Sequence, residues 1–383
     1  MLDPGLPRHD THPLDVEELR TRVQKALDDV LAHQADVLEE VSPECVPLVE
    51  SVHDLVAGGK RLRPAFCYWG WRGAGGQDDD CVVRAAAALE LFHAAALIHD
   101  DVMDRSDTRR GMPAVHRRFA TLHRGNSWTG DAERFGHAAA ILAGDLCLSW
   151  SDEVLSGCGL APARIRAGKA VFDRMRTQLM GGQYLDMLEQ AVAATGGGRT
   201  GGRHAGHDGA DAGPDPVVRA RRVIRFKSAK YTIEHPLLLG GTLAGAAAEV
   251  LAAYSAYGMP LGEAFQLRDD VLGVFGDPVE TGKPAGDDLR EGKRTALVAL
   301  AVQRADPSQA ALVRRLLGDP GLDEAGVARL REVIVDTGAR QTVEQLISDL
   351  VSTSRAALHR APVTDEARTV LSGLVDAATS RDA

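Results

Sequence analysis

Apolar side chains recur along most of the chain at the spacing of an α-helix. Between residues 16 and 40, Leu19, Val23 and Leu27 follow one another every four positions and would share one face of a helix. The same spacing returns at 327–337 and at many other places, while the strict alternation typical of a β-strand is scarcely found. The pattern therefore predicts an all-α protein.

Two alanine-rich segments, 85–96 and 243–253, suggest where the helices pack most closely. Small side chains allow neighbouring helices to approach each other, so we expect both segments at the centre of a helical bundle. Residues 73–80 contain several glycines and polar residues and are expected to form a short turn.

Domain organisation is expected to be simple. Residues 1–14 are rich in proline, histidine and aspartate and are expected to form a disordered tail. Residues 15–383 are expected to form one domain. Within it, residues 194–216 are rich in glycine, histidine and aspartate and have almost nothing to bury, which predicts a flexible loop.

Composition limits the possible functions. The chain has 44 Lys and Arg against 54 Asp and Glu, a net charge of -10, which argues against nucleic-acid binding over the whole surface. Its five cysteines include no C-x-x-C pair, which favours a reducing compartment. No secretory signal is visible, and the uncharged stretches 236–248 and 250–262 are too short to span a membrane. We therefore expect a cytoplasmic protein without a membrane span.

A first acidic motif, HDDVMD, ends the apolar helix expected from about residue 85. Asp100 and Asp104 would lie on one face of this helix, where their charges repel unless a cation lies between them. One interpretation is an ordinary solvated helix end. The other is a Mg²⁺ site, because carboxylate oxygens at the mouth of an apolar wall suit an ion that completes its coordination with phosphate oxygens and water.

A second motif, FQLRDD, supplies Asp269 and Asp270 near the end of another apolar helix. The two acidic pairs could face each other across one cavity and hold a metal-bound diphosphate. The second motif is incomplete, because Gly273 stands where a fifth-position acid would be. Asp277 could return to the same face only if the helix continues past Gly273.

Basic residues offer complementary charge. GGKRLRP is a compact cationic cluster, and Arg109 and Arg110 follow the first acidic motif after a short loop. Alone, either cluster would be read as solvated surface, but beside two acidic motifs they are candidates for binding phosphate oxygens. Further lysines flank the second motif: Lys227, Lys283 and Lys293.

With these motifs, the sequence resembles the trans-isoprenyl diphosphate synthases of the polyprenyl synthetase family, especially the geranylgeranyl type. The matching stretches occur in family order from about residue 58 to 295: GGKRLRP, ELFHAAALIHDDVMDRSDTRRGMP, AILAGDL, GGQYLD, RFKSAKYTIEHPL, FQLRDDVLGVFGD and TGKPAGDDLREGKRT. The resemblance implies a homodimer of all-α isoprenoid synthase bundles, each with a central cavity. It also implies Mg²⁺, three ions with substrate bound, and two substrates, isopentenyl diphosphate and an allylic prenyl diphosphate.

The resemblance also implies a role for each matching residue. Asp100 and Asp104 would bind two ions with support from Asp101, and Asp269 would bind the third with support from Asp270. The isopentenyl diphosphate would be held by Lys60, Arg63, His93 and Arg110. The allylic diphosphate would be held by Arg109, Lys227, Gln266, Lys283 and Lys293. Gln183 and Ser228 would also take part in substrate binding, and Gln183 and Asp186 would support the polar network of the cavity.

Product length in this family depends on what closes the cavity below the first motif. Relatives with an aromatic residue four or five positions before the motif make short products, whereas here Ala95 and Ala96 hold those positions. The first bulky residue below them is Phe92, about 4.5 Å further along the helix axis, near the length of one isoprene unit. Geranylgeranyl diphosphate is thus the expected product, with the farnesyl and farnesylgeranyl products as neighbouring alternatives. Phe92 could instead point into a helix interface.

Two other functions remain open at this point. A class I terpene cyclase also uses an Asp-rich motif with Mg²⁺, but it would have a different second motif and no isopentenyl site. A catalytically silent partner subunit of a true synthase would explain the incomplete second motif. No Ser-His-Asp or Cys-His arrangement for nucleophilic catalysis is apparent.

Overall fold

The computed structural model describes residues 16–194, 215–277, 286–319 and 321–379. The contacts divide the chain into two units. Unit 1 comprises the residues up to Val171 together with Pro236–Tyr254 and Ala361–Ala377, and unit 2 comprises Phe172–His235, Ser255–Arg360 and the residues from Ala378. Each unit is described separately below.

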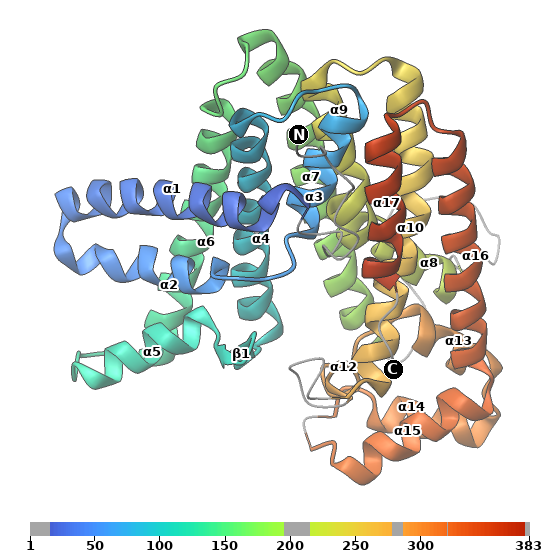
Figure 1. The fold of residues 1–383 in the computed structure, drawn as a ribbon. Coiled ribbons are helices and arrows are strands. Elements are labelled where there is room, and N and C mark those ends of the chain that lie inside the picture. Colours follow the sequence, from blue (N-terminus) through green and yellow to red (C-terminus); the bar gives the residue numbers. More distant parts are fainter. Residues whose placement is uncertain (1–15, 195–214, 278–285, 320, 380–383) are drawn as a thin grey trace, which may run out of the picture. The chain divides into compact units, whose positions relative to one another are not determined.

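Unit 1 consists of helices and one short pair of strands. Its elements are η1 (Val16–Glu18), α1 (Leu19–Val41), η2 (Pro43–Cys45), α2 (Val46–Val56), α3 (Leu62–Gly73), α4 (Asp80–Asp104), β1 (Thr108–Arg109), β2 (Met112–Pro113), α5 (Val115–Gly125), α6 (Ala132–Ser156) and α17 (Asp365–Thr379). It also holds most of α9 (His235–Ala244) and the first residues of α7 (Pro162–Ala194) and α10 (Ala248–Phe275). Figure 1 shows α1 and α2 side by side and running in opposite directions.

The described residues of unit 2 form helices joined by loops and turns, without a strand. It holds the larger parts of α7 and α10, then α8 (Pro216–Val223), η3 (Ile224–Glu234), α12 (Asp287–Arg290), α13 (Ala296–Arg304), α14 (Pro307–Leu316), α15 (Glu324–Asp336) and α16 (Ala339–Arg360). Its core is made by apolar faces of α10, α13, α15 and α16. The element η3 is a π-helix, and the His235 N–H donates to the Lys230 carbonyl five residues earlier.

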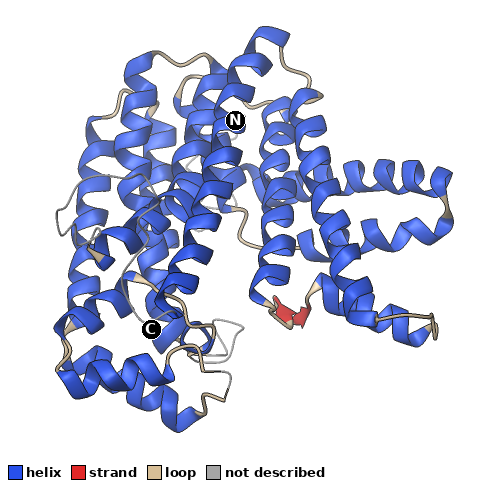
Figure 2. Ribbon diagram, turned by 180° about the vertical axis from the view of Figure 1, so that it is seen from behind, coloured by secondary structure: helices blue, strands red, loops and turns tan. Residues whose placement is uncertain are grey.

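The helical prediction is confirmed. Figure 2, coloured by secondary structure, shows that the described residues are mostly helical and include one strand pair, β1 with β2, which hydrophobic spacing did not indicate. The segment expected as a helix at 16–40 is η1 followed by α1, with Leu19, Val23 and Leu27 fully buried. The segment at 327–337 lies almost entirely in α15.

Helix α4 is the central helix of unit 1. It begins at Asp80, five residues before the expected start, because the Asp79 side chain caps it by accepting from the Cys81 N–H. Ala85 and its neighbours are fully buried against α3 and α6, as expected for the first alanine-rich segment. By length and composition α4 could cross a membrane, but 72% of its apolar window is buried inside the protein, as in a core helix.

The second alanine-rich segment was wrongly placed at the centre of a bundle. Helix α9 ends at Ala244, Gly245 adopts a positive φ of 75°, and α10 begins only at Ala248. Residues 245–249 are largely exposed. Small side chains here accompany a turn rather than a close helix contact.

The remaining expectations about organisation stay predictions. The tail at 1–14 lies outside the described residues, as does most of the loop at 194–216, which is bounded by the end of α7 at Ala194 and the start of α8 at Pro216. The short turn expected at 73–80 is confirmed, since α3 ends at Gly73 and α4 begins at Asp80.

Candidate active site

The acidic end of α4 is fixed by the way the helix stops. Arg105 adopts a left-handed conformation with φ of 56°, and the N–H groups of Arg105 and Ser106 both donate to the Asp101 carbonyl. The helix therefore ends directly after Asp104. Asp100 and Asp104 are half-buried on the open face of α4, as their spacing predicted.

Asp101 points to the other side of α4 and is only 2% exposed. Its Oδ1 accepts from Arg109 Nε at 2.9 Å and also from Arg109 Nη2. The structure thus places Asp101 in an ion pair with Arg109, where it orients the guanidinium beside the acidic end of the helix.

Arg109 and Arg110 are presented by the β1–β2 hairpin. Its two-residue turn consists of Arg110 and Gly111, with φ of 53° and 74°, and positive φ at both positions is what a type I′ turn requires. A left-handed arginine costs roughly 1–2 kcal/mol, and such residues concentrate at functional sites. Arg110 Nη1 donates to the Leu55 carbonyl at 2.7 Å, and this hydrogen bond holds the guanidinium at the end of α2.

The cluster GGKRLRP lies at the same place. Arg61 is only 3% exposed, and its Nη1 donates to Glu90 of α4 at 2.6 Å, so this arginine anchors the segment. Lys60 is exposed and Arg63 is half-buried on either side of it. Gly59 has φ of 99°, and a side chain there would lie 3.4 Å from the Arg110 guanidinium. The structure therefore brings Arg110 against the loop that carries Lys60.

His93 lies near several positively charged arginine side chains. It lies on α4 two turns before Asp100, on the same open face. Burial lowers the pKa of His93 well below its usual value, and the charges of Arg63, Arg110, Arg109 and Arg61 lower it further. Burial and the neighbouring arginines also lower the pKa of Arg110, against the opposing effect of Glu90. Lys60, Arg63, His93 and Arg110, predicted to act together, are thus all in unit 1, and the last three are in electrostatic contact.

His99 was not predicted as a site residue, although it directly precedes the first motif. Its Nε2 lies 3.2 Å from the Ile141 carbonyl oxygen and 3.7 Å from Asp145 Oδ1, both on α6. Gly144 of α6 makes this contact possible, because a side chain there would overlap with the imidazole. His99 thereby connects the acidic end of α4 to α6. The stretch AILAGDL contained the signal, as it supplies both Gly144 and Asp145.

Lys227 and its partner form the first half of the polar site in unit 2. Lys227 Nζ donates to Asp186 Oδ2 of α7 at 2.5 Å. The backbones of α7 and η3 approach each other closely here, because a Cβ added to Gly182 would lie 2.5 Å from the backbone nitrogen of Lys227. Ser228 is buried in the same π-helix, and Gln183 is half-buried on α7.

The second acidic motif lies near the end of α10. Asp269 is half-buried and Asp270 is 5% exposed. Gln266 donates to Asp270 Oδ1 at 2.9 Å, whereas Asp270 Oδ2 has no hydrogen-bond partner among the described residues. Burial raises the pKa of Asp270 to about 8, and the charges of Asp288 and Asp269 add to this effect.

An acid that the sequence analysis did not single out, Asp288, lies next to this motif. A side chain on Gly273 would overlap with the Asp288 carboxylate, whose Oδ1 accepts from Lys293 at 3.0 Å. Burial opposes the charge of Lys293, but Asp288 and Glu291 outweigh burial and hold its pKa well above the usual value. Helix α10 continues through Gly273 but ends at Phe275, so Asp277 lies beyond the helix and is exposed.

Some expectations about the site stay predictions. Lys283 lies outside the described residues. Asp100 and Asp104 belong to unit 1, and Asp269 and Asp270 belong to unit 2, so the expected cavity between the two motifs is untested. Within the described residues, no three His, Cys, Asp or Glu side chains already form a metal-binding group.

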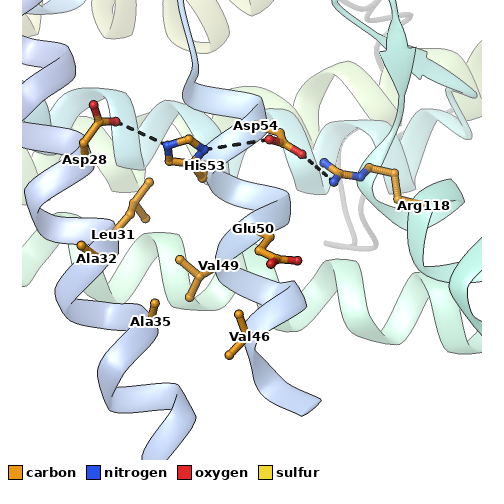
Figure 3. Close-up of a pocket in the computed structure, with 10 residues that line it drawn as sticks. All are labelled: Asp28, Leu31, Ala32, Ala35, Val46, Val49, Glu50, His53, Asp54 and Arg118. Carbon is orange, nitrogen blue, oxygen red and sulfur yellow. Dashed lines mark hydrogen bonds and ion pairs between the residues drawn. The ribbon is translucent and has the colours of Figure 1, made fainter. Parts of the chain in front are cut away.

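A pocket of about 430 Å³ within unit 1 involves none of the predicted site residues. It lies between α1, α2 and α5 and has an apolar floor that includes Leu31 and Val49. Figure 3 shows the charged rim, where His53 lies between Asp28 and Asp54 and Asp54 accepts from Arg118. These contacts tie the three helices together at a place separate from the acidic end of α4.

Comparisons with known proteins point to one family. The family model for polyprenyl synthetase matches residues 46–334. A geranylfarnesyl diphosphate synthase of Aeropyrum pernix is 32% identical over 331 residues, which cover 85% of this chain and 91% of that protein. A geranylgeranyl diphosphate synthase of Methanosarcina mazei is 35% identical over 277 residues, 71% of this chain and 74% of that protein.

Solved structures give the same result for the fold. A geranylgeranyl pyrophosphate synthase from Corynebacterium glutamicum, crystallised with isoprenyl diphosphate and magnesium, has a TM-score of 0.87 and 38% sequence identity. The match covers 96% of this chain and 100% of that one. Because the family model spans most of the chain and includes both acidic motifs and the basic cluster, the chain belongs to the polyprenyl synthetase family.

Proposed function

We propose that this protein condenses isopentenyl diphosphate with an allylic diphosphate, head to tail, to make a short-chain trans-prenyl diphosphate, and that geranylgeranyl diphosphate is its main product. The chain is a prenyltransferase of the family named above, and similar proteins carry geranylgeranyl or geranylfarnesyl diphosphate synthase activity in their names. The observation that carries the proposal is the convergence of several arginines on His93, two helical turns from Asp100.

The basic site of unit 1 suits isopentenyl diphosphate. Arg63 and Arg110 can grip phosphate oxygens through two N–H groups each, and Lys60 adds an exposed point charge. With its pKa lowered, His93 stays neutral at pH 7 and offers one ring N–H to the diphosphate. Arg61 is committed to Glu90 and serves to hold the others in place.

The allylic diphosphate would be bound by residues from both units. Arg109, oriented by Asp101, is the contribution of unit 1. In unit 2, Lys227 is oriented by Asp186, and Lys293 lies beside the second acidic motif with Asp288. Gln266 faces Asp270, which places its amide at the same end of α10. Lys283 completes the proposed set.

Both acidic motifs fit Mg²⁺. The ligands are hard carboxylate oxygens, and in the part of the chain that the structure describes the buried Asp270 Oδ2 has no hydrogen-bond partner. Asp100 and Asp104 would hold two ions and Asp269 a third, each completed by diphosphate oxygens and water rather than by a closed protein cage. The ions would supply positive charge that stabilises the departing diphosphate.

The chain's own residues account for the rest of the reaction. The C–O bond of the allylic diphosphate breaks, and Arg109, Lys227 and Lys293 stabilise the negative charge that collects on the leaving diphosphate. The double bond of isopentenyl diphosphate attacks the allylic cation, and the product loses a proton to the released diphosphate. Water must be excluded meanwhile, which the half-buried apolar side chains Ala96 and Leu97, between His93 and Asp100 on α4, would favour.

Product length, subunit organisation and location are the finer parts of the proposal. Phe92, fully buried on α4 one turn before the half-buried Ala96, would close the cavity below Ala95 and Ala96 and limit the product to geranylgeranyl length. The working form would be a homodimer located in the cytoplasm.

One incubation tests the proposed function. Purified protein with Mg²⁺, isopentenyl diphosphate and each allylic diphosphate in turn should release inorganic diphosphate and form longer prenyl diphosphates, identified by mass spectrometry. Chelation of Mg²⁺ should abolish the reaction. Cyclic hydrocarbon products formed without isopentenyl diphosphate would indicate a terpene cyclase, and no turnover unless a second synthase is added would indicate a silent partner subunit.

A further inference from the structure

The pocket between α1, α2 and α5 has the dimensions of a small-molecule site. Its volume is about 430 Å³, within the range of about 300–1,000 Å³ that is typical of such sites. Figure 3 shows α1 and α2 on either side of it, with Arg118 of α5 at the rim. A helix of a partner protein would instead need an extended apolar groove. The size of the pocket therefore favours a small ligand.

Apolar side chains from two helices form the floor of this pocket. Leu31 of α1 and Val49 of α2 are 2% and 4% exposed. Ala35 and Val46 line the same floor and are half-buried. A hydrocarbon group placed against these side chains would be removed from water. The floor thus suits an apolar tail.

Carboxylates outnumber cations on the rim. Asp28, Glu50 and Asp54 line the pocket, and among the described residues one guanidinium, that of Arg118, accompanies them. Asp54 accepts from Arg118 Nη2 at 2.6 Å, so these two charges neutralise each other. Glu50, one turn before Asp54 on the same face of α2, is exposed and has no hydrogen bond or ion pair within the described residues. Residues 28–50, which supply most of the lining, contain no Lys or Arg.

Asp28 adds a second carboxylate that is not held in an ion pair with Lys or Arg in the part of the chain that the structure describes. Its Oδ1 accepts from Gln24 at 2.7 Å and lies 3.6 Å from His53 Nε2. Lys25 acts electrostatically on Asp28 but forms its ion pair with Asp29. The rim therefore carries negative charge that attracts a cation.

The chemistry of the rim selects among cations. No Phe, Tyr or Trp is among the described residues that line the pocket, and aromatic rings are the groups that recognise quaternary ammonium ligands. A primary ammonium instead donates three hydrogen bonds, which suits carboxylate acceptors. An amphiphile with an anionic head, such as a prenyl diphosphate, would be repelled by this rim.

We propose that this pocket is a binding site for a primary ammonium compound with a short apolar tail. The ammonium group lies at Glu50, one helical turn from Asp54, and the tail lies on Leu31 and Val49. Such a ligand is opposite in charge to the diphosphates of the proposed reaction, so the site is separate from that reaction and does not rest on it.

Isothermal titration calorimetry on the full-length protein tests this assignment, with octylammonium as the probe. We expect saturable binding of one octylammonium per chain at neutral pH. Octyl sulfate has the same tail and the opposite charge, and should bind at least about 10-fold more weakly. Octyltrimethylammonium cannot donate hydrogen bonds and should bind about 3-fold more weakly. Methylammonium lacks the tail and should bind at least about 10-fold more weakly.

Two variants test the rim and the floor separately. Glu50→Gln removes the charge at the rim and should weaken octylammonium binding about 3-fold. Glu39→Gln, the same change at an exposed acid of α1 that does not line the pocket, is the matched control and should bind as the wild type does. Ala35→Leu fills the floor and should weaken binding at least about 10-fold. Circular dichroism melting establishes that each variant is folded, and Ala32→Leu, at an exposed lining position, replaces Ala35→Leu if that variant is not.

Three results would overturn the proposal. Octyl sulfate binding as tightly as octylammonium would show that the tail alone determines affinity. Equal weakening in Glu50→Gln and Glu39→Gln would show a general attraction to the acidic helices instead of a site. A wild-type protein without saturable octylammonium binding would show that the pocket does not take this class of ligand.

Discussion

At the scale of single residues, burial separates the charged side chains that hold the structure from those that are open to a ligand. Arg61 and Glu90 are 3% and 4% exposed and neutralise each other, so losing either would leave an unpaired buried charge. Lys60, one position before Arg61, is exposed. These two adjacent residues of one basic motif therefore have different roles: Arg61 stabilises the structure, and Lys60 is open to a ligand.

Phe92 allows a direct test of the proposed cavity floor. Replacing Phe92 with Ala removes the first bulky side chain below Ala95 and Ala96. The main product should therefore become longer by at least one isoprene unit. The variant also leaves a cavity and is expected to lose about 3–5 kcal/mol of stability. Products are identified by mass spectrometry after short incubations at a temperature where the variant is folded.

Phe66→Ala is the matched control for this prediction. Phe66 lies on α3 and is fully buried, like Phe92, so its removal should cost a similar amount of stability. Its product should stay the same length. If Phe92→Ala also makes an unchanged product, Phe92 packs in a helix interface and does not limit chain length.

Single-residue roles could be predicted from sequence only where they depend on spacing along one helix. Asp100 and Asp104 share a face of α4 as their four-residue separation required. The pairing of Arg61 with Glu90 and the position of Asp288 over Gly273 join residues from different elements. Spacing along the chain carries no information about such contacts, which is why the position of Asp288 beside Gly273 could not be predicted from the sequence.

At the scale of elements, the contact between α7 and η3 depends on one of two adjacent glycines. Gly182 faces the Lys227 backbone, and a side chain there would overlap with it, whereas no described atom lies within 4 Å of a Cβ added to Gly181. The two positions therefore differ sharply although both belong to the stretch GGQYLD.

Replacing each glycine with Ala should give opposite results. Gly182→Ala should push η3 away from α7, cost about 1–3 kcal/mol of stability and disturb the pairing of Lys227 with Asp186, which would raise the KM for the allylic diphosphate. Gly181→Ala should raise stability by up to about 1 kcal/mol through helix propensity, with unchanged kinetics. Thermal melts and steady-state kinetics provide the comparison, and equal behaviour of the two variants would contradict the proposed contact.

Elements were predictable where their apolar periodicity is long and uninterrupted. The helix expected at 16–40 and the one at 327–337 were found within a few residues of their expected ends. The β1–β2 hairpin has two residues in each strand, too few for an alternating pattern to be recognised. The segment 243–253 was misjudged because composition alone does not distinguish small residues at a helix contact from small residues around a turn at Gly245.

At the scale of the whole molecule, α6 supplies a surface that fits the proposed homodimer. Phe135 and Leu142 lie two turns apart on α6, with Ile141 beside them, and these side chains are 38%, 56% and 47% exposed. The Trp128 ring packs edge-on against Phe135 with its centroid 5.4 Å away, which extends the apolar surface. A second copy of the chain would remove these side chains from water.

Leu142→Glu should dissociate the proposed dimer. In a two-fold symmetric interface the substitution introduces two charges, one from each subunit, and leaves both without partners. Sedimentation equilibrium should show the dimer weakened by at least about 100-fold, corresponding to roughly 3 kcal/mol. Val335→Glu, on an exposed apolar residue of α15, should leave the association unchanged. An unaffected dimer in Leu142→Glu would place the interface elsewhere.

The π-helix at Ile224–Glu234 has a consequence for how this segment tolerates changes in length. Its wider turns give Lys227 and Ser228 an angular position that an ordinary helix through the same residues would not reproduce. Deleting one of the uncharged residues between 224 and 234 would let the segment rewind to 3.6 residues per turn, which turns the flanking side chains by about 100°. Such a shortened chain would retain every charged group named above and still direct its lysine away from Asp186.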